Sequence, residues 1–209
     1  GRPQGDNRAI AGLRRTSLEY VNFGSAGVKV SPLALGMGLR EQSSAEEAER
    51  LVHHAIDAGI NFIDTSNNYS AGKSESHIGE ALKGRRNDAI IATKFNVQRL
   101  EGESVHDRIH RKIDESLKSL QTDFIDLYQI HFAPRDIPQE EVLEPMNDLV
   151  KAGKVRFIGE CNYFGWRHAQ ADAITEKNGW ARMASSQNHY HLFRRQVELE
   201  LLPFCAENN

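Results

Sequence analysis

The chain has 209 residues, of which 39% are hydrophobic and 26% are charged, a composition typical of a single globular domain with a sizeable core. The formal net charge of −3 gives no reason to expect nucleic acid or an anionic membrane as a partner. No apolar run reaches the about 18 residues that a transmembrane helix requires. The two cysteines, Cys161 and Cys205, do not form a disulfide framework, which favours a cytoplasmic protein.

The first 30 residues predict an arm followed by a hairpin. Residues 1–17 are polar and rich in arginine without any periodicity, so we expect a flexible arm. Residues 18–23 and 28–30 alternate around a glycine-bounded turn at 24–27, which indicates a short β-hairpin. The domain that follows the arm is therefore expected to cover residues 18–209.

From Leu33 onward the chain repeats a strand-helix unit of about 30 residues. Short apolar strands are expected to begin near Leu33, Asn61, Ala89, Phe124, Val155 and Ala184. An amphipathic helix follows each strand. Ser44 and Glu47 form a capping box that predicts the start of the first helix. The fifth helix is expected to bury a stripe of Trp166, Ala169, Ala173 and Ile174.

Regular alternation of strands and helices indicates a parallel sheet with helices outside it. Such a sheet either closes into a (β/α)₈ TIM barrel or stays open as a doubly wound sheet. No Gly-x-Gly-x-x-Gly follows any strand, which counts against a dinucleotide-binding Rossmann turn. We therefore expect an α/β fold of the TIM-barrel class, with about six of its eight units present.

Polar side chains stand where successive strands are expected to end: Asp64, Tyr69, Lys94 and His131. In a parallel barrel these ends meet at one face, where functional groups gather. A carboxylate, a phenol, an ammonium and an imidazole together suit proton transfer to a carbonyl oxygen. Each of these residues alone has an ordinary structural explanation, but their order and local contexts favour a common site.

The local sequences around these residues resemble the aldo-keto reductase family, especially the bacterial branch that is similar to potassium-channel β-subunits. The resemblance covers roughly residues 18–209 and rests on 62–69, 72–75, 78–82, 92–95, 126–131, 153–159, Asn162 and 186–187. Two features depart from the family pattern. Cys161 stands where a serine is usual, and family members continue with two further strand-helix units. We therefore expect that the chain lacks the C-terminal third of such a barrel.

The resemblance implies an NADPH-dependent carbonyl reductase acting on a small aldehyde or ketone, with NADH not excluded. Nothing in a protein is a hydride source, so a nicotinamide cofactor must supply the hydride. Tyr69 is expected to donate the proton, aided by the Lys94 ammonium, which Asp64 holds in place. A neutral His131 would orient the carbonyl. The cofactor is expected to contact Gly36, Met37, Asp64, Cys161, Asn162 and Gln187, with the last two binding the nicotinamide carboxamide.

Other interpretations stay open. The chain could be a cofactor-binding regulatory or sensory subunit with little turnover, or it could fold without competent cofactor binding. The pairs His106–His110 and His189–His191 could contact a metal, but the sequence shows no third ligand, so a surface or structural role is favoured and no metal is expected. The oligomeric state is left open.

Overall fold

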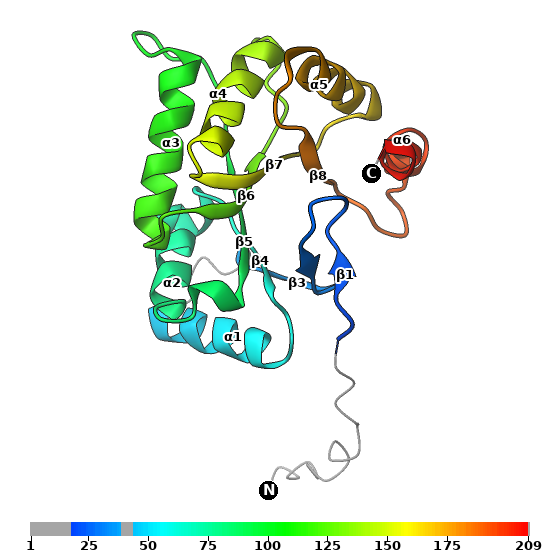
Figure 1. Cartoon of the computed structure of the whole chain (residues 1–209). Helices are drawn as coiled ribbons and strands as arrows, with labels where there is room; N and C mark the ends of the chain where they lie inside the picture. The colour runs from blue at the N-terminus through cyan, green and yellow to red at the C-terminus, as the bar shows by residue number, and fades with distance from the viewer. Residues whose placement is uncertain (1–17, 39–43, 209) are drawn as a thin grey trace, which may run out of the picture.

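A parallel sheet of six strands curls into an arc in the computed structural model, which describes residues 18–38 and 44–208 (Figure 1). The expected arm over residues 1–17 lies outside the described residues. Each strand pairs in parallel with the next one along the chain. The strands are β3 (Ala34–Gly36), β4 (Phe62–Asp64), β5 (Ile90–Phe95), β6 (Ile125–Ile130), β7 (Val155–Cys161) and β8 (Met183–Gln187).

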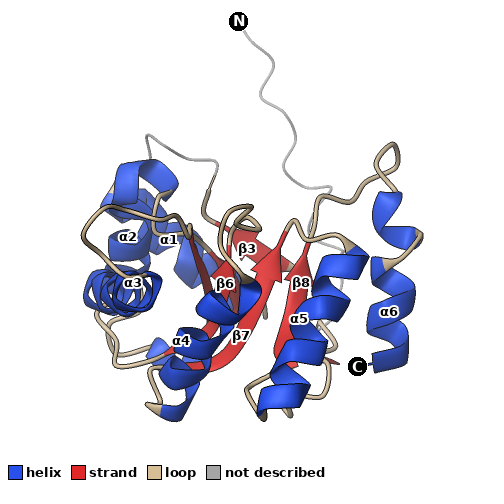
Figure 2. Cartoon of the chain, turned by 90° about the horizontal axis from the view of Figure 1, so that it is seen from above, coloured by secondary structure: helices blue, strands red, loops and turns tan. Residues whose placement is uncertain are grey.

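Helices cover the outside of the arc, as the view from above shows (Figure 2). They are α1 (Ala45–Asp57), α2 (Lys73–Ala81), α3 (Val105–Leu120), α4 (Gln139–Lys151), α5 (Gly165–Asn178) and α6 (Leu201–Asn208). The strand order never reverses, which excludes the doubly wound alternative. The expected barrel class with six of eight units is confirmed, and the arc is open between β3 and β8 within the described residues.

Local sequence signals explain how the first helix begins and ends. The Ser44 side chain accepts a hydrogen bond from the Glu47 backbone N–H, and the Glu47 side chain accepts one from the Ser44 backbone N–H. The predicted capping box is therefore confirmed. Helix α1 ends at Asp57, and Gly59 follows with a φ of 91°, a conformation that glycine adopts at little cost.

The hydrophobic core lies between the sheet and the helices. Its fully buried members include Val52, Ile63, Ile78, Ile91, Ile109, Ile113, Ile125, Leu149 and Ile158. The predicted face of α5 is wrong, because Trp166 is 58% exposed and the helix buries His168 and Ala171 instead. The reason is a polar one: the His168 ring is hydrogen-bonded to the buried carboxylate of Glu160 in β7. Apolar periodicity alone does not reveal such a pair.

The predicted hairpin is present and lies at the amino ends of the strands of the arc. Strand β1 (Val21–Asn22) pairs antiparallel with β2 (Lys29–Val30). The ring of Phe23, in the turn between them, lies 5.9 Å from the ring of Phe62 and 6.2 Å from that of Phe157. Phe62 begins β4 and Phe157 lies early in β7, so the hairpin packs at the amino ends of the strands. The carboxyl ends remain open.

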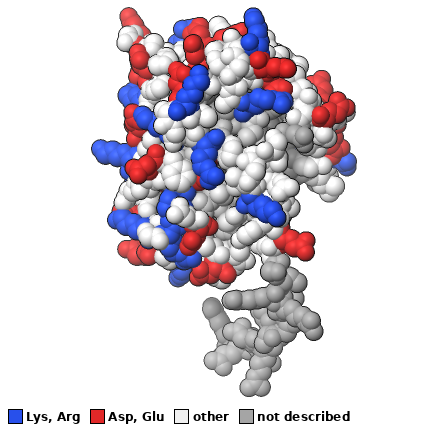
Figure 3. Space-filling model, in the orientation of Figure 1, with Lys and Arg blue, Asp and Glu red and all other residues white. Residues whose placement is uncertain are grey.

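Charged groups of both signs are interspersed on the surface shown in Figure 3. Many of them form short ion pairs, such as Arg85 with Asp88 and Arg111 with Glu115. Among the described residues, every helix is too short or too polar to cross a bilayer. Cys161 and Cys205 are both free thiols, as expected.

Candidate active site

The four predicted polar residues lie at or just beyond the carboxyl ends of three neighbouring strands. Asp64 is the last residue of β4, Lys94 is the penultimate residue of β5, and His131 directly follows β6. Tyr69 begins η2 (Tyr69–Gly72), a short 3₁₀ turn between β4 and α2. Parallel pairing keeps these ends on one edge of the sheet, so the four side chains share the open end of the arc.

Lys94 and Asp64 form a close ion pair. The Lys94 ammonium donates to both carboxylate oxygens of Asp64 and to the backbone carbonyl of Thr65, each at 2.7 Å. The Lys94 side chain is 1% exposed, whereas that of Asp64 is 13% exposed. A buried ammonium is costly unless its donors are satisfied, and here three acceptors match its three N–H groups. The position of the ammonium is thus fixed.

The Tyr69 ring packs against this ion pair and against the imidazole. The Lys94 nitrogen lies 5.1 Å from the centre of the Tyr69 ring, and the ring of His131 stands edge-on to it at 5.8 Å. Gly38 lies on another side: a Cβ atom at this position would come within 2.8 Å of the Tyr69 ring. Gly38 therefore makes room for Tyr69, a function that the sequence did not reveal.

Backbone strain is concentrated around the site. The described residues contain four non-glycine residues with positive φ, and three of them flank the site: Ser70, Ala71 and Asn162. Ser70 and Ala71 directly follow Tyr69, and Asn162 directly follows β7. Left-handed backbone costs energy in most residues and is found preferentially where function requires a particular geometry.

The environment of His131 keeps its imidazole neutral near pH 7. Burial and the neighbouring Lys94 ammonium lower the pKa of His131 below its ordinary 6.5, against a smaller opposing effect of Asp64. Its Nδ1 is buried and has no hydrogen-bond partner among the described residues. A neutral imidazole has one donor and one acceptor nitrogen, so it can donate to a carbonyl oxygen.

Asn162, Gln187 and Cys161 meet at the ends of β7 and β8. Asn162 donates from its side-chain amide to the His131 carbonyl at 3.0 Å, and Gln187 donates from its amide to Asp64 at 3.1 Å. Both amide side chains belong to exposed residues, and each amide nitrogen carries a second N–H. Cys161 is buried, which raises the pKa of its thiol to about 12, and it contacts Gln187 at 3.4 Å. It is therefore a neutral packing residue at neutral pH.

The two predicted residues at the end of the first strand differ in what they offer a ligand. Met37 as a whole residue is only 7% exposed and belongs to the core. Its N–H donates to the Asp64 carbonyl at 2.9 Å. Gly36 is exposed, and a Cβ atom there would meet nothing within 4 Å. The space above Gly36 is thus open.

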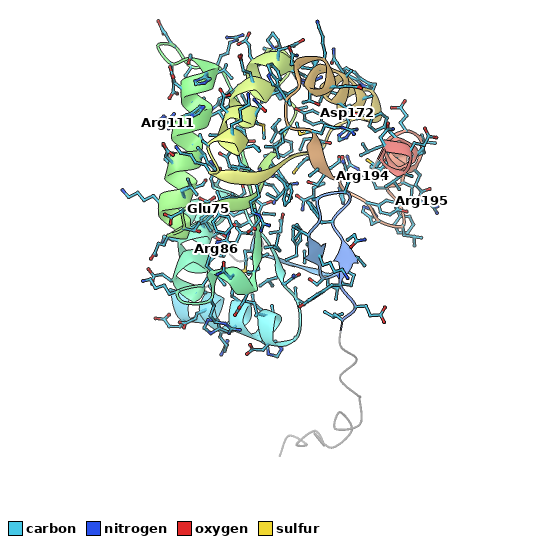
Figure 4. All side chains as sticks on the ribbon, viewed as in Figure 1. Glu75, Arg86, Arg111, Asp172, Arg194 and Arg195 are labelled. Atoms are coloured by element: carbon cyan, nitrogen blue, oxygen red, sulfur yellow. The ribbon has the colours of Figure 1, made fainter. Side chains whose placement is uncertain are left out.

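A buried polar network behind the site was not predicted. Thr93 in β5 donates to the carboxylate of Glu75 in α2 at 2.6 Å, and the hydroxyls of Thr65 and Ser74 are 2.7 Å apart. Figure 4 shows Glu75 on the side of α2 that faces the strands. Burial raises the pKa of Glu75 above its ordinary value near 4.5, although Thr93 opposes the shift. The sequence signal that could have revealed this network is the presence of polar residues inside otherwise apolar strands.

A cavity of about 220 Å³ adjoins the site between the start of α5 and the segment that follows β8. Asn162 lines it from one side, and His189 and Arg194 line it from the other. The Arg194 guanidinium contacts the His189 ring nitrogen at 3.1 Å. The cavity therefore joins a site residue to a cationic side chain, which the sequence did not predict.

Comparisons with known proteins match this architecture. The model of the Aldo/keto reductase family matches residues 32–209. The oxidoreductase YrpG of Bacillus subtilis is 37% identical over 91% of this chain and 63% of its own length. A thermostable aldo-keto reductase, Tm1743, solved with the inhibitor epalrestat, has a TM-score of 0.82 and 32% identity over 91% of this chain and 70% of its own. An aldo/keto reductase from Klebsiella pneumoniae was solved with NADP and acetate. It has a TM-score of 0.75 and 30% identity over 86% of this chain and 62% of its own.

The fold is a large part of a parallel (β/α) barrel that gathers polar side chains at the carboxyl ends of its strands. The chain belongs to the aldo/keto reductase family, which confirms the resemblance drawn from its motifs. It spans less than two thirds of the length of the curated relative named above.

Proposed function

We propose that the chain carries the catalytic residues of an NAD(P)H-dependent reductase that converts a small aldehyde or ketone into an alcohol. One observation carries this proposal: a buried ammonium, fixed by a carboxylate, lies against a tyrosine ring that also meets a neutral imidazole. Such a group can deliver a proton to a carbonyl oxygen and orient it. Family membership and the Klebsiella pneumoniae neighbour that holds NADP support the same conclusion.

The residues present fit a nicotinamide cofactor. Asn162 and Gln187 offer exposed amides at the open end of the arc, which suit the nicotinamide carboxamide. The open space above Gly36 lets a ring approach the backbone of β3. The cofactor would lie near Asp64, Met37 and Cys161, of which Met37 is packed in the core and Cys161 carries a neutral thiol.

The bound cofactor would supply the hydride that attacks the carbonyl carbon. In our proposal, the Tyr69 hydroxyl gives its proton to the carbonyl oxygen as negative charge develops there. The Lys94 ammonium stabilises the resulting phenolate, and Asp64 holds Lys94 in place. His131 donates an N–H to the same carbonyl oxygen and so sets its direction.

The test is consumption of reduced nicotinamide in the presence of a simple aromatic aldehyde, followed by its absorbance, with NADPH and NADH compared. We expect aldehyde-dependent oxidation and a preference for NADPH. Fluorescence titration of each cofactor in the absence of aldehyde separates the alternatives. Tight binding without turnover would indicate the regulatory or sensory subunit, and no binding would indicate a chain that folds without a competent cofactor site.

A further inference from the structure

Three side chains of metal-binding types meet in the helical layer outside the sheet. His106 and His110 belong to α3, and Asp148 belongs to α4. One nitrogen of each imidazole and one oxygen of the carboxylate all lie within 4.8 Å of one another. His106 Nε2 is 3.6 Å from Asp148 Oδ2. This cluster shares no residue with the candidate active site.

Helix geometry explains why the two histidines act as a pair. Residues four apart lie one turn apart on the same helix face. The two rings accordingly lie face to face, with centres 4.4 Å apart and planes 23° from parallel. The third group of the cluster, Asp148, comes from the neighbouring helix α4, 38 residues beyond His110, which the local sequence does not reveal.

The electrostatic surroundings favour a cation at this position. His110 Nε2 is buried and has no hydrogen-bond partner among the described residues. Asp148, Asp114 and Asp107 face the cluster with negative charge. Lys154 opposes a cation, but its ammonium is hydrogen-bonded to Asp114.

We propose that His106, His110 and Asp148 bind a divalent transition-metal ion, zinc foremost, which links α3 to α4. Two imidazoles and one carboxylate suit Zn²⁺, with water as a fourth ligand, whereas Mg²⁺ and Ca²⁺ prefer oxygen ligands throughout. Zinc bonds of about 2.0–2.1 Å place tetrahedral ligand atoms about 3.3 Å apart. Small side-chain rotations from the observed separations reach that geometry. Because His106 and Asp148 are partly exposed, the ion can exchange with solvent.

Calorimetric titration of the tag-free, chelator-treated 209-residue chain with zinc chloride tests the proposal. We expect one Zn²⁺ per chain with micromolar affinity, no comparable binding of Mg²⁺, and a higher melting temperature with zinc. His110→Gln and Asp148→Asn should each weaken binding by on the order of tenfold or more, because each removes one of three ligands. His54→Gln, at an exposed histidine of α1, is the matched control and should bind zinc like the wild type.

Circular dichroism of each variant shows whether it remains folded, and the two substitutions at different helices guard against a local packing effect. Cobalt titration adds an independent readout, because tetrahedral Co²⁺ with nitrogen and oxygen ligands absorbs in the visible region. Zinc binding that is no tighter than millimolar, or that both variants retain at wild-type strength, would overturn the proposal. In the second case the ion would lie elsewhere, for example at His189 and His191.

Discussion

Gln187 at the end of β8 donates a hydrogen bond to Asp64 at the end of β4, with Nε2 and Oδ1 3.1 Å apart. Three strands separate β4 from β8 in the sheet order. In a flat sheet four steps of about 4.8 Å would hold these strands about 19 Å apart. The curvature of the arc therefore brings Gln187, which is predicted to bind the cofactor, into contact with the carboxylate that also holds Lys94.

Tyr69→Phe tests the proton donor. Phe keeps the ring that packs against Lys94 and His131 and removes only the hydroxyl. We expect the turnover of aldehyde to fall by about 10²–10⁴-fold, with cofactor affinity nearly unchanged. Steady-state kinetics and fluorescence titration measure the two quantities. Tyr20→Phe, at an exposed tyrosine, is the control, and a Tyr69→Phe turnover within a few-fold of wild type would contradict the assignment.

Lys94→Met and Asp64→Asn test the ion pair. Lys94→Met removes the cation that stabilises the phenolate, so we expect a loss of about 10²-fold or more in kcat. Asp64→Asn should cost less, because Lys94 stays and keeps the Thr65 carbonyl as a partner. Lys83→Met, at a lysine whose side chain is 61% exposed, is the control for the substitution itself. Equal kinetics for Lys94→Met and wild type would mean that another group acts on Tyr69.

Gly38→Ala tests the packing of the Tyr69 ring. The added methyl would come within 2.8 Å of the ring, which must then move. We expect kcat to fall by about tenfold, since a displacement of about 1 Å at a reacting group can cost about 10²-fold. A double-mutant cycle with Tyr69→Phe separates this effect from general damage. Gly38→Ala should add little to the loss of turnover once the hydroxyl is gone, and independent effects would show that Gly38 acts elsewhere.

Glu75→Gln tests the buried carboxyl behind the site. Its raised pKa means that the folded chain holds the proton more tightly than the unfolded chain does. Below the ordinary pKa near 4.5 the carboxyl is protonated in both the folded and the unfolded chain, so it does not oppose folding. As the pH rises from there through the pKa of the folded chain, the free energy of unfolding decreases. For each unit by which the two pKa values differ, the free energy of unfolding falls by about 1.4 kcal/mol.

The glutamine variant should accordingly unfold at higher urea than wild type at pH 8, and the difference should shrink toward pH 4. The amide oxygen can still accept from Thr93, and the amide N–H can donate to the buried Ser116 hydroxyl, which interacts with the carboxyl in the wild type. Urea unfolding followed by circular dichroism across this pH range measures the effect. A variant less stable than wild type at pH 8 would show that the ionised carboxylate contributes to folding.

Sequence patterns located the strands because apolar runs are bounded by turn residues. The expected starts at Asn61, Ala89 and Phe124 lie one residue from the observed strands, which also placed Asp64, Lys94 and His131 at one edge. Patterns could not supply contacts that depend on curvature or on neighbouring helices. The Gln187–Asp64 bond joins residues 123 positions apart. The contact of Gly38 with Tyr69 could not be predicted, because nothing in the local sequence shows which ring lies beside this glycine.

The sequential strand order has a consequence for how the protein folds. In the part of the chain that the structure describes, neighbouring strands of the arc are always consecutive in the chain. Each pairing therefore closes a loop of only one strand-helix unit, which keeps the entropy cost of each step small and favours fast pairing. During synthesis, each new strand meets an edge that the preceding strand already presents. We expect the order of the units in the gene to be the order in which they join the sheet.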